Sequence, residues 1–140
     1  MTQLTDITSI KVNDFGSKKQ HSYVEALLEI KNLRLRTIIG FNDWERKTKQ
    51  DVVINIKAGF TPGNSTKSDR VEDTLNYKTL TKRVIKAVEE SEFNLLEKLT
   101  QMILDIVMEN HRIIWAKVKV DKPFALRFSD SVSIELSAKR

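Results

Sequence analysis

The clearest pattern in the chain is a strict alternation of side chains from Gln50 to Phe60, where every second residue is apolar. Successive side chains of a β-strand point to opposite faces, so this alternation predicts a half-buried strand. Weaker forms of the same pattern predict three more strands, from Glu29 to about Gly40, from Ile114 to Asp121 and from Val132 to Ala138. The Thr-Pro-Gly-Asn-Ser run at residues 61–65 predicts a loop.

Two segments between the second and third strands have a helical period instead. From Tyr77 to Glu92, apolar residues recur every three to four positions and form one stripe. A second helix is predicted from Leu95 to Asn110, and it carries apolar residues on its far side as well, at Leu104 and Met108. A helix that is apolar on both faces needs cover on both faces, so we expect a second subunit to pack there.

The predicted order is strand, strand, helix, helix, strand, strand. The simplest packing of that order is an α+β fold, with a four-stranded antiparallel sheet and two helices on one of its faces. Residues 1–28 are polar and show no sustained period. We therefore expect a poorly ordered N-terminal extension at 1–28 and a single domain at 29–140.

Composition narrows the possible chemistry. The 140-residue chain has no cysteine, so a disulfide, a thiolate metal site and a cysteine nucleophile are excluded. Its two histidines, His21 and His111, lie in the extension and at a helix end, which argues against a zinc site. Neither of the common glycine-rich nucleotide-binding motifs is present. We expect chemistry that uses lysine, tyrosine, carboxylates and the substrate itself, with no metal and no cofactor.

Charge and hydropathy indicate the kind of partner and the compartment. The net charge of +5 suggests an anionic partner, but the basic residues are scattered and no nucleic-acid motif accompanies them. A phosphorylated small molecule fits this charge, and we expect neither nucleic acid nor membrane as a partner. The N-terminus has no continuous apolar run, and no segment approaches the roughly 18–20 apolar residues of a membrane span, so we expect a cytoplasmic protein.

Four positions could carry chemistry, although each also has a purely structural interpretation. Glu97 follows Asn94 at capping-box spacing, but an ionised carboxylate at a helix N-terminus could also hold a guanidine-like edge. Lys122 precedes Pro123, which restricts its backbone and so aims its side chain. Tyr77 opens the first helix, where its ring could simply pack over the helix entry. Glu45 lies in a loop, where it could be an exposed charge that pairs with a neighbouring cation.

Together these segments resemble the dihydroneopterin aldolase family, whose members adopt the tunnelling fold, or T-fold. The family pattern is a glycine, a glutamate and a glutamine five residues later, a tyrosine that opens one helix, a Leu-Leu-Glu that opens the next, and a lysine at a strand end. The corresponding residues here are Gly40, Glu45, Gln50, Tyr77, Leu95-Leu96-Glu97 and Lys122. The resemblance extends from about Glu29 to Arg140.

Within the family, three segments resemble the branch that inverts C2′ of the dihydroneopterin triphosphate side chain, at residues 75–82, 95–101 and 125–133. Asp43-Trp44-Glu45 instead resembles some aldolases, which cleave the side chain and release glycolaldehyde. Both activities therefore remain open, as does a basic binding module on the same fold without enzymatic activity.

The resemblance also implies roles for these residues. Lys122 would move the proton of the 2′-hydroxyl in a retro-aldol and aldol sequence that needs no metal. Glu97 and the backbone of Leu96 would hold the pterin ring, while Glu45 would bind side-chain hydroxyls. Tyr77 would complete the pocket from a neighbouring subunit of an octamer made of two tetrameric rings. Arg127, five residues after Lys122, could hold phosphate oxygens with its planar guanidinium.

Overall fold

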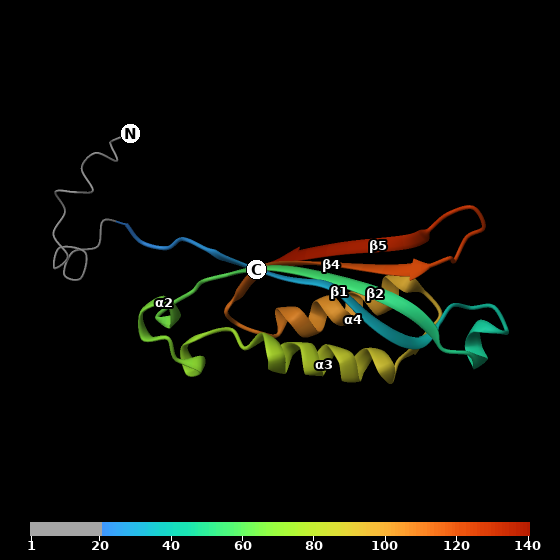
Figure 1. Cartoon of the computed structure of the whole chain (residues 1–140), viewed down its shortest axis with the longest axis horizontal. Coiled ribbons are helices and arrows are strands. Elements are labelled where there is room, and N and C mark those ends of the chain that lie inside the picture. The colour runs from blue at the N-terminus through green and yellow to red at the C-terminus, as the bar shows by residue number, and fades with distance from the viewer. Residues whose placement is uncertain (1–20) are drawn as a thin grey trace.

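The structure, a computed structural model, describes residues 21–140 and contains one curved five-stranded sheet (Figure 1). Strands β1 (Ala26–Ile39), β2 (Gln50–Phe60), β4 (Ile113–Pro123) and β5 (Ser131–Lys139) pair with one another in antiparallel order. The fifth strand, β3 (Glu92–Phe93), runs parallel to the end of β1. The prediction of four strands was therefore short by one, because a strand of two residues is too brief to show any alternation.

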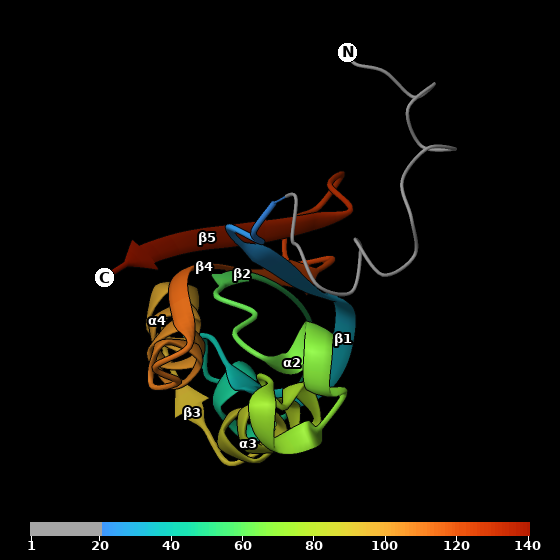
Figure 2. The same cartoon turned by 90° about the vertical axis from the view of Figure 1, so that its left-hand side faces the viewer.

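The two long helices, α3 (Tyr77–Glu89) and α4 (Leu96–Met108), cover one face of the sheet, as predicted. Figure 2 shows the sheet curving over this helical layer. A short helix α2 (Ser65–Ser68) and two 3-10 turns, η2 (Glu45–Lys47) and η3 (Val71–Asp73), lie in the connections. The start of α3 follows directly from the sequence, because the Asn76 side chain accepts hydrogen bonds from the backbone N–H groups of Lys78 and Thr79.

The hydrophobic core lies between the sheet and these helices. Alternate residues of β2 and β4 and one stripe of each long helix fill it, among them Val52, Ile54, Ile56, Val84, Val88, Leu99, Ile103, Val118 and Val120. The apolar positions predicted for β2 are thus confirmed. The middle of the opposite face carries polar side chains, among them Asn55, Lys57, Lys117, Lys119 and Glu135, which is the usual arrangement for an antiparallel sheet covered on one side.

The expectation that Leu104 faces a second subunit was wrong. Its side chain is only 6% exposed within the single chain, and Met108 packs against the same core. Helix α4 contacts β4 and β5 as well as α3, so one chain already covers both of its apolar faces. A helix with two apolar faces can be covered entirely by elements of its own chain, as α4 is by β4, β5 and α3.

At the N-terminus, the strand expected from Glu29 begins three residues earlier, at Ala26. The expectation of a poorly ordered extension falls largely on residues 1–20, which lie outside the described residues. From residue 21 to residue 140, no helix is both long enough and apolar enough to cross a membrane.

Candidate active site

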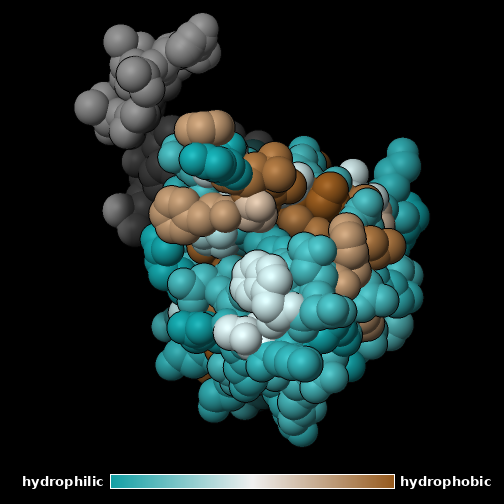
Figure 3. Space-filling model, turned by 90° about the vertical axis from the view of Figure 1, so that its right-hand side faces the viewer, coloured by the Kyte–Doolittle hydropathy of each residue, from teal (hydrophilic) through white to brown (hydrophobic). Residues whose placement is uncertain are grey.

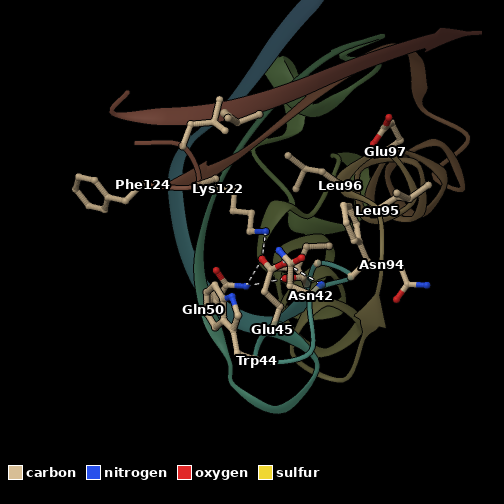
Figure 4. Close-up of a pocket in the computed structure, with 16 residues that line it drawn as sticks. Asn42, Trp44, Glu45, Gln50, Asn94, Leu95, Leu96, Glu97, Lys122 and Phe124 are labelled. Atoms are coloured by element: carbon tan, nitrogen blue, oxygen red, sulfur yellow. Dashed lines mark hydrogen bonds and ion pairs between the residues drawn. The ribbon is translucent and has the colours of Figure 1, made fainter. Parts of the chain in front are cut away.

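A pocket of about 370 Å³ opens at one end of the sheet, where the ends of several strands and the start of a helix meet (Figure 4). The end of β1, the start of β2, the end of β4 and the start of α4 all contribute to it. Its lining residues include Gly40, Phe41, Asn42, Trp44, Glu45, Gln50, Asn94, Leu95, Leu96, Glu97, Lys122, Phe124 and Leu126. The pocket therefore contains every part of the family pattern except Tyr77.

An ion pair between Glu45 and Lys122 lies inside this pocket. Their side chains are only 5% and 14% exposed, so the pair is largely removed from water. The two residues are 77 positions apart in the chain and come from η2 and β4. Interpreting Glu45 as an exposed loop charge was therefore wrong, and its partner is Lys122 rather than a neighbouring basic residue.

Both carboxylate oxygens of Glu45 are fully engaged. Asn42 donates to Oε1 from its backbone N–H at 3.2 Å and from its side-chain Nδ2 at 2.9 Å. Gln50 donates to Oε2 at 3.1 Å, beside Lys122 Nζ. A carboxylate offers about four acceptor positions. All four are occupied, so a substrate hydroxyl can bind Glu45 only when one of these donors leaves.

Gly40 is the position that allows this arrangement. Its φ of +119° is left-handed, a region that L-residues with a side chain rarely adopt. A Cβ atom at this position would overlap the carboxylate of Glu45. The glycine of the family pattern thus leaves the space that the carboxylate of Glu45, five residues later, occupies.

The electrostatics of the pair keep Glu45 ionised. Burial by itself would raise the pKa of this carboxyl group. Hydrogen bonds from Lys122, Gln50 and the Asn42 backbone, together with the positive charge of Lys122, outweigh burial and lower its pKa below the ordinary value of 4.5. The resting site therefore holds a carboxylate and an ammonium group side by side.

This lowered pKa leads to a prediction for acid stability. The folded state binds the Glu45 proton more weakly than the unfolded state, so the ion pair stabilises the fold fully above about pH 4.5. That contribution is lost as the pH falls through the folded-state pKa. We expect the difference in unfolding free energy between the wild type and Glu45→Gln to be largest at neutral pH and to shrink below pH 4.5 in urea titrations. A difference that stays constant from neutral pH down to pH 3 would contradict this account.

Glu97 and Leu96 form the opposite wall, in the first turn of α4. The capping-box interpretation of the Asn94–Glu97 spacing was wrong, because the helix N-cap is Leu95 and no side chain caps it. Glu97 is exposed, and Figure 4 shows it beyond Leu96, apart from the cluster around Glu45. The first N–H groups of a helix have no partner within the helix, so this turn offers both a carboxylate and free donors.

Tyr77 and Arg127 lie outside the pocket lining of the single chain. Tyr77 opens α3 at the opposite end of the molecule, a full helix length of 13 residues, or about 20 Å, from the pocket end. Arg127 lies in the exposed connection between β4 and β5, and its guanidinium stacks over the Phe128 ring at 5.1 Å. Leu126, next to Arg127 in the chain, does line the pocket.

Sequence reasoning missed several residues of this site. Asn42 donates two hydrogen bonds to Glu45. Arg46 donates to the backbone carbonyls of Gly40, Glu92 and Phe93. Neither Asn42 nor Arg46 belongs to the family pattern considered above. It also missed the exposed apolar side chains around the mouth, which include Trp44 at 59% and Phe124 at 82% exposure. Figure 3 views this end of the molecule and shows the apolar surface gathered there. Within residues 21–140, no three His, Cys, Asp or Glu side chains cluster as a metal site would require.

Comparison with known proteins agrees with this geometry. The family profile described as FolB, dihydroneopterin aldolase, matches residues 28–137. Dihydroneopterin triphosphate 2′-epimerase of Escherichia coli K12 is 48% identical over 115 residues, which cover 82% of this chain and 96% of that enzyme. The epimerase of Pseudomonas aeruginosa is 49% identical and is covered to 94%.

Among solved structures, the E. coli dihydroneopterin aldolase in complex with neopterin superposes with a TM-score of 0.76 at 26% identity. The match covers 81% of this chain and 98% of that one. The α+β T-fold expected from the resemblance is thus confirmed, with five strands in place of four. On the strength of the profile match and of these relatives, the chain belongs to the dihydroneopterin aldolase family.

Proposed function

We propose that this protein is an epimerase that inverts C2′ of 7,8-dihydroneopterin triphosphate to give dihydromonapterin triphosphate. The observation that carries the proposal is the 48–49% identity to epimerases over nearly their whole length, against 26% for the aldolase structure. The buried Glu45–Lys122 pair inside the pocket is suited to the proton transfers that this reaction requires. A phosphorylated, water-soluble substrate also agrees with a cytoplasmic enzyme.

The reaction needs one carbon–carbon bond to break and re-form. Lys122 first gives its own proton to solvent, and its neutral amine then takes the proton of the 2′-hydroxyl through a water molecule. The C1′–C2′ bond breaks as the 2′-oxygen becomes an aldehyde. The electrons of that bond pass into the imine of the dihydropterin ring. When the aldehyde turns over before the bond re-forms, C2′ is inverted and the new 2′-alkoxide takes the proton back from Lys122.

Glu45 and Glu97 have separate roles in this scheme. Glu45 balances the positive charge of Lys122. Once the Lys122 amine moves away from Oε2 of Glu45, that oxygen accepts a hydrogen bond from a substrate hydroxyl. Glu97 accepts hydrogen bonds from the amino group and N3–H of the pterin, and the backbone N–H of Leu96 donates beside it. Such a pair of charge-assisted bonds matches the guanidine-like edge of the ring.

We also propose that the site is completed by a second copy of the chain within an octamer of two tetrameric rings. Tyr77 lies too far from its own pocket to act there, so it would contribute to the pocket of a neighbour. Strand β5 is the last strand of the sheet and leaves an open edge that another subunit could pair with. The exposed apolar mouth of the pocket, with Phe41, Trp44 and Phe124, is the kind of surface that a partner covers.

Arg127 is the proposed anchor for the triphosphate. A triphosphate requires fixed cations near the pocket mouth, and the connection that carries Arg127 lies there. We expect Arg127→Ala to weaken turnover of the triphosphate far more than turnover of unphosphorylated dihydroneopterin. The preference of the wild type should fade as salt is raised, since exposed charge pairs are screened. Equal losses of kcat/KM on both substrates would remove Arg127 from phosphate binding.

The activity itself is tested by incubating the protein with dihydroneopterin triphosphate and separating the dephosphorylated pterins on a chiral column. Monapterin as the main product supports the epimerase. Free aldehyde as the main product would instead identify an aldolase, which the Asp43-Trp44-Glu45 segment keeps as a second candidate. No turnover, together with salt-sensitive binding of nucleic acid, would indicate a binding module.

A further inference from the structure

The guanidinium of Arg46 joins two segments that are separate in the sequence. Its Nη1 donates to the carbonyl of Gly40 and to that of Phe93, both at 3.1 Å. Its Nη2 donates to the carbonyl of Glu92 at 2.7 Å. One half-buried side chain thus holds three backbone carbonyls, one from the loop after β1 and two from β3.

These two segments lead to the two walls of the pocket. Gly40 begins the loop that carries Glu45, the partner of Lys122, and Arg46 itself follows Glu45 in η2. Phe93 ends β3 and is followed directly by Asn94, Leu95, Leu96 and Glu97. Apart from Arg46, few contacts join the two segments here. Strand β3 pairs with β1 over two residues, and the Gly40 N–H donates one hydrogen bond to the Phe93 carbonyl at 3.1 Å.

We propose that Arg46 is a positioning residue that sets the distance between the proton-transfer wall, Glu45 with Lys122, and the ring-binding wall, Leu96 with Glu97. The inference rests on the proposed function, because it requires the two walls to hold different parts of one substrate. A guanidinium suits this task because its planar group presents five donors in a fixed geometry. A lysine could donate to one or two of these carbonyls but could not span both segments in the same rigid way.

The test is the variant Arg46→Met, which keeps much of the side-chain volume and loses all three hydrogen bonds. The ring contacts are assigned to the first turn of α4, which Leu99 and Ile103 of the same helix anchor in the core, so the dissociation constant for neopterin should stay close to that of the wild type. The reacting carbon, however, would no longer be held in line with Lys122. Because small misplacements can cost up to about 100-fold in rate, we expect kcat to fall by at least about 10-fold.

Two further variants make the result specific. Arg34→Met removes an exposed arginine of β1, for which no side-chain hydrogen bond or ion pair is found among residues 21–140, and it should match the wild type. Arg46→Lys keeps the positive charge and some donors, so its kcat should lie between those of the wild type and Arg46→Met. If Arg46→Met does not fold, a folded Arg46→Lys with reduced kcat and unchanged neopterin binding supports the proposal.

Other outcomes overturn it. Unchanged kcat in folded Arg46→Met, or in folded Arg46→Lys where the methionine variant fails to fold, would show that Arg46 does not align the walls. Parallel losses of kcat and neopterin binding that follow the folded fraction would show a purely structural role. A wild-type protein without turnover of either dihydroneopterin or its triphosphate would reject the proposed function first, and this inference with it. Circular dichroism on each sample measures the folded fraction.

Discussion

Replacing Lys122 with methionine should slow turnover by orders of magnitude while leaving the pterin ring bound. Lys122 is the cation paired with Glu45 in the pocket, and we assign it the proton of the 2′-hydroxyl. A positioned general acid–base group contributes on the order of 10²–10⁴-fold to a rate, so we expect kcat to fall by that factor. We assign the ring contacts to the start of α4, so the dissociation constant for neopterin should change little. Single-turnover kinetics and fluorescence titration measure the two quantities.

Removal of Lys122 also leaves the buried Glu45 carboxylate without its cation, and breaking a buried pair in this way can cost about 3–5 kcal/mol. The double variant Glu45→Gln/Lys122→Met removes both charges and should regain much of that stability. If the single variant is inactive only because the site collapses, the double variant should recover turnover. We expect it to recover stability alone. Lys119→Met, on the exposed face of the same strand, is the matched control and should retain full activity.

Local signals in the sequence were enough to predict most of the fold. The alternation from Gln50 to Phe60 gave β2 with its observed ends, and Tyr77 was identified as the first residue of α3. Both follow from interactions within a few residues, namely strand alternation and the Asn76 cap. The helix ends were less well placed, since α3 stops at Glu89 and α4 at Met108, before the predicted ends. Apolar periodicity shows which face of a helix is buried, but it does not mark the residue at which the helix ends.

Of the residues assigned to the site from the sequence, the structure places Glu45, Leu96, Glu97 and Lys122 around one pocket, but the sequence did not reveal their contacts. The resemblance indicated Glu45 and Lys122, yet nothing near either residue reveals that they form one ion pair, because 77 positions separate them. The four donors around Glu45 likewise depend on a left-handed Gly40 and on a 3-10 turn, which periodicity does not detect. Leu104 was misassigned for a related reason. A helical wheel shows which faces need cover, but not whether the cover comes from the same chain.

The second large effect expected is on binding, through Glu97. In Glu97→Gln the amide can accept one hydrogen bond from the pterin edge, and its own N–H₂ group then meets a donor of the ring. Hydrogen bonds to charged groups contribute about 1.5–3 kcal/mol, and each 1.4 kcal/mol is tenfold in affinity. We therefore expect the dissociation constant for neopterin to rise by roughly 10–100-fold, with a smaller change in kcat at saturating substrate.

The structure also predicts that this variant folds normally. Glu97 caps no backbone group of α4, and its side chain is exposed, so the midpoint of thermal unfolding should stay close to that of the wild type. Asp105→Asn, an exposed carboxylate further along the same helix, is the matched control and should bind neopterin normally. Equal affinities for wild type and Glu97→Gln would mean that the ring is held elsewhere. A loss of kcat without a loss of affinity would instead assign Glu97 to proton transfer. The assignment of ring binding to this wall would then be wrong.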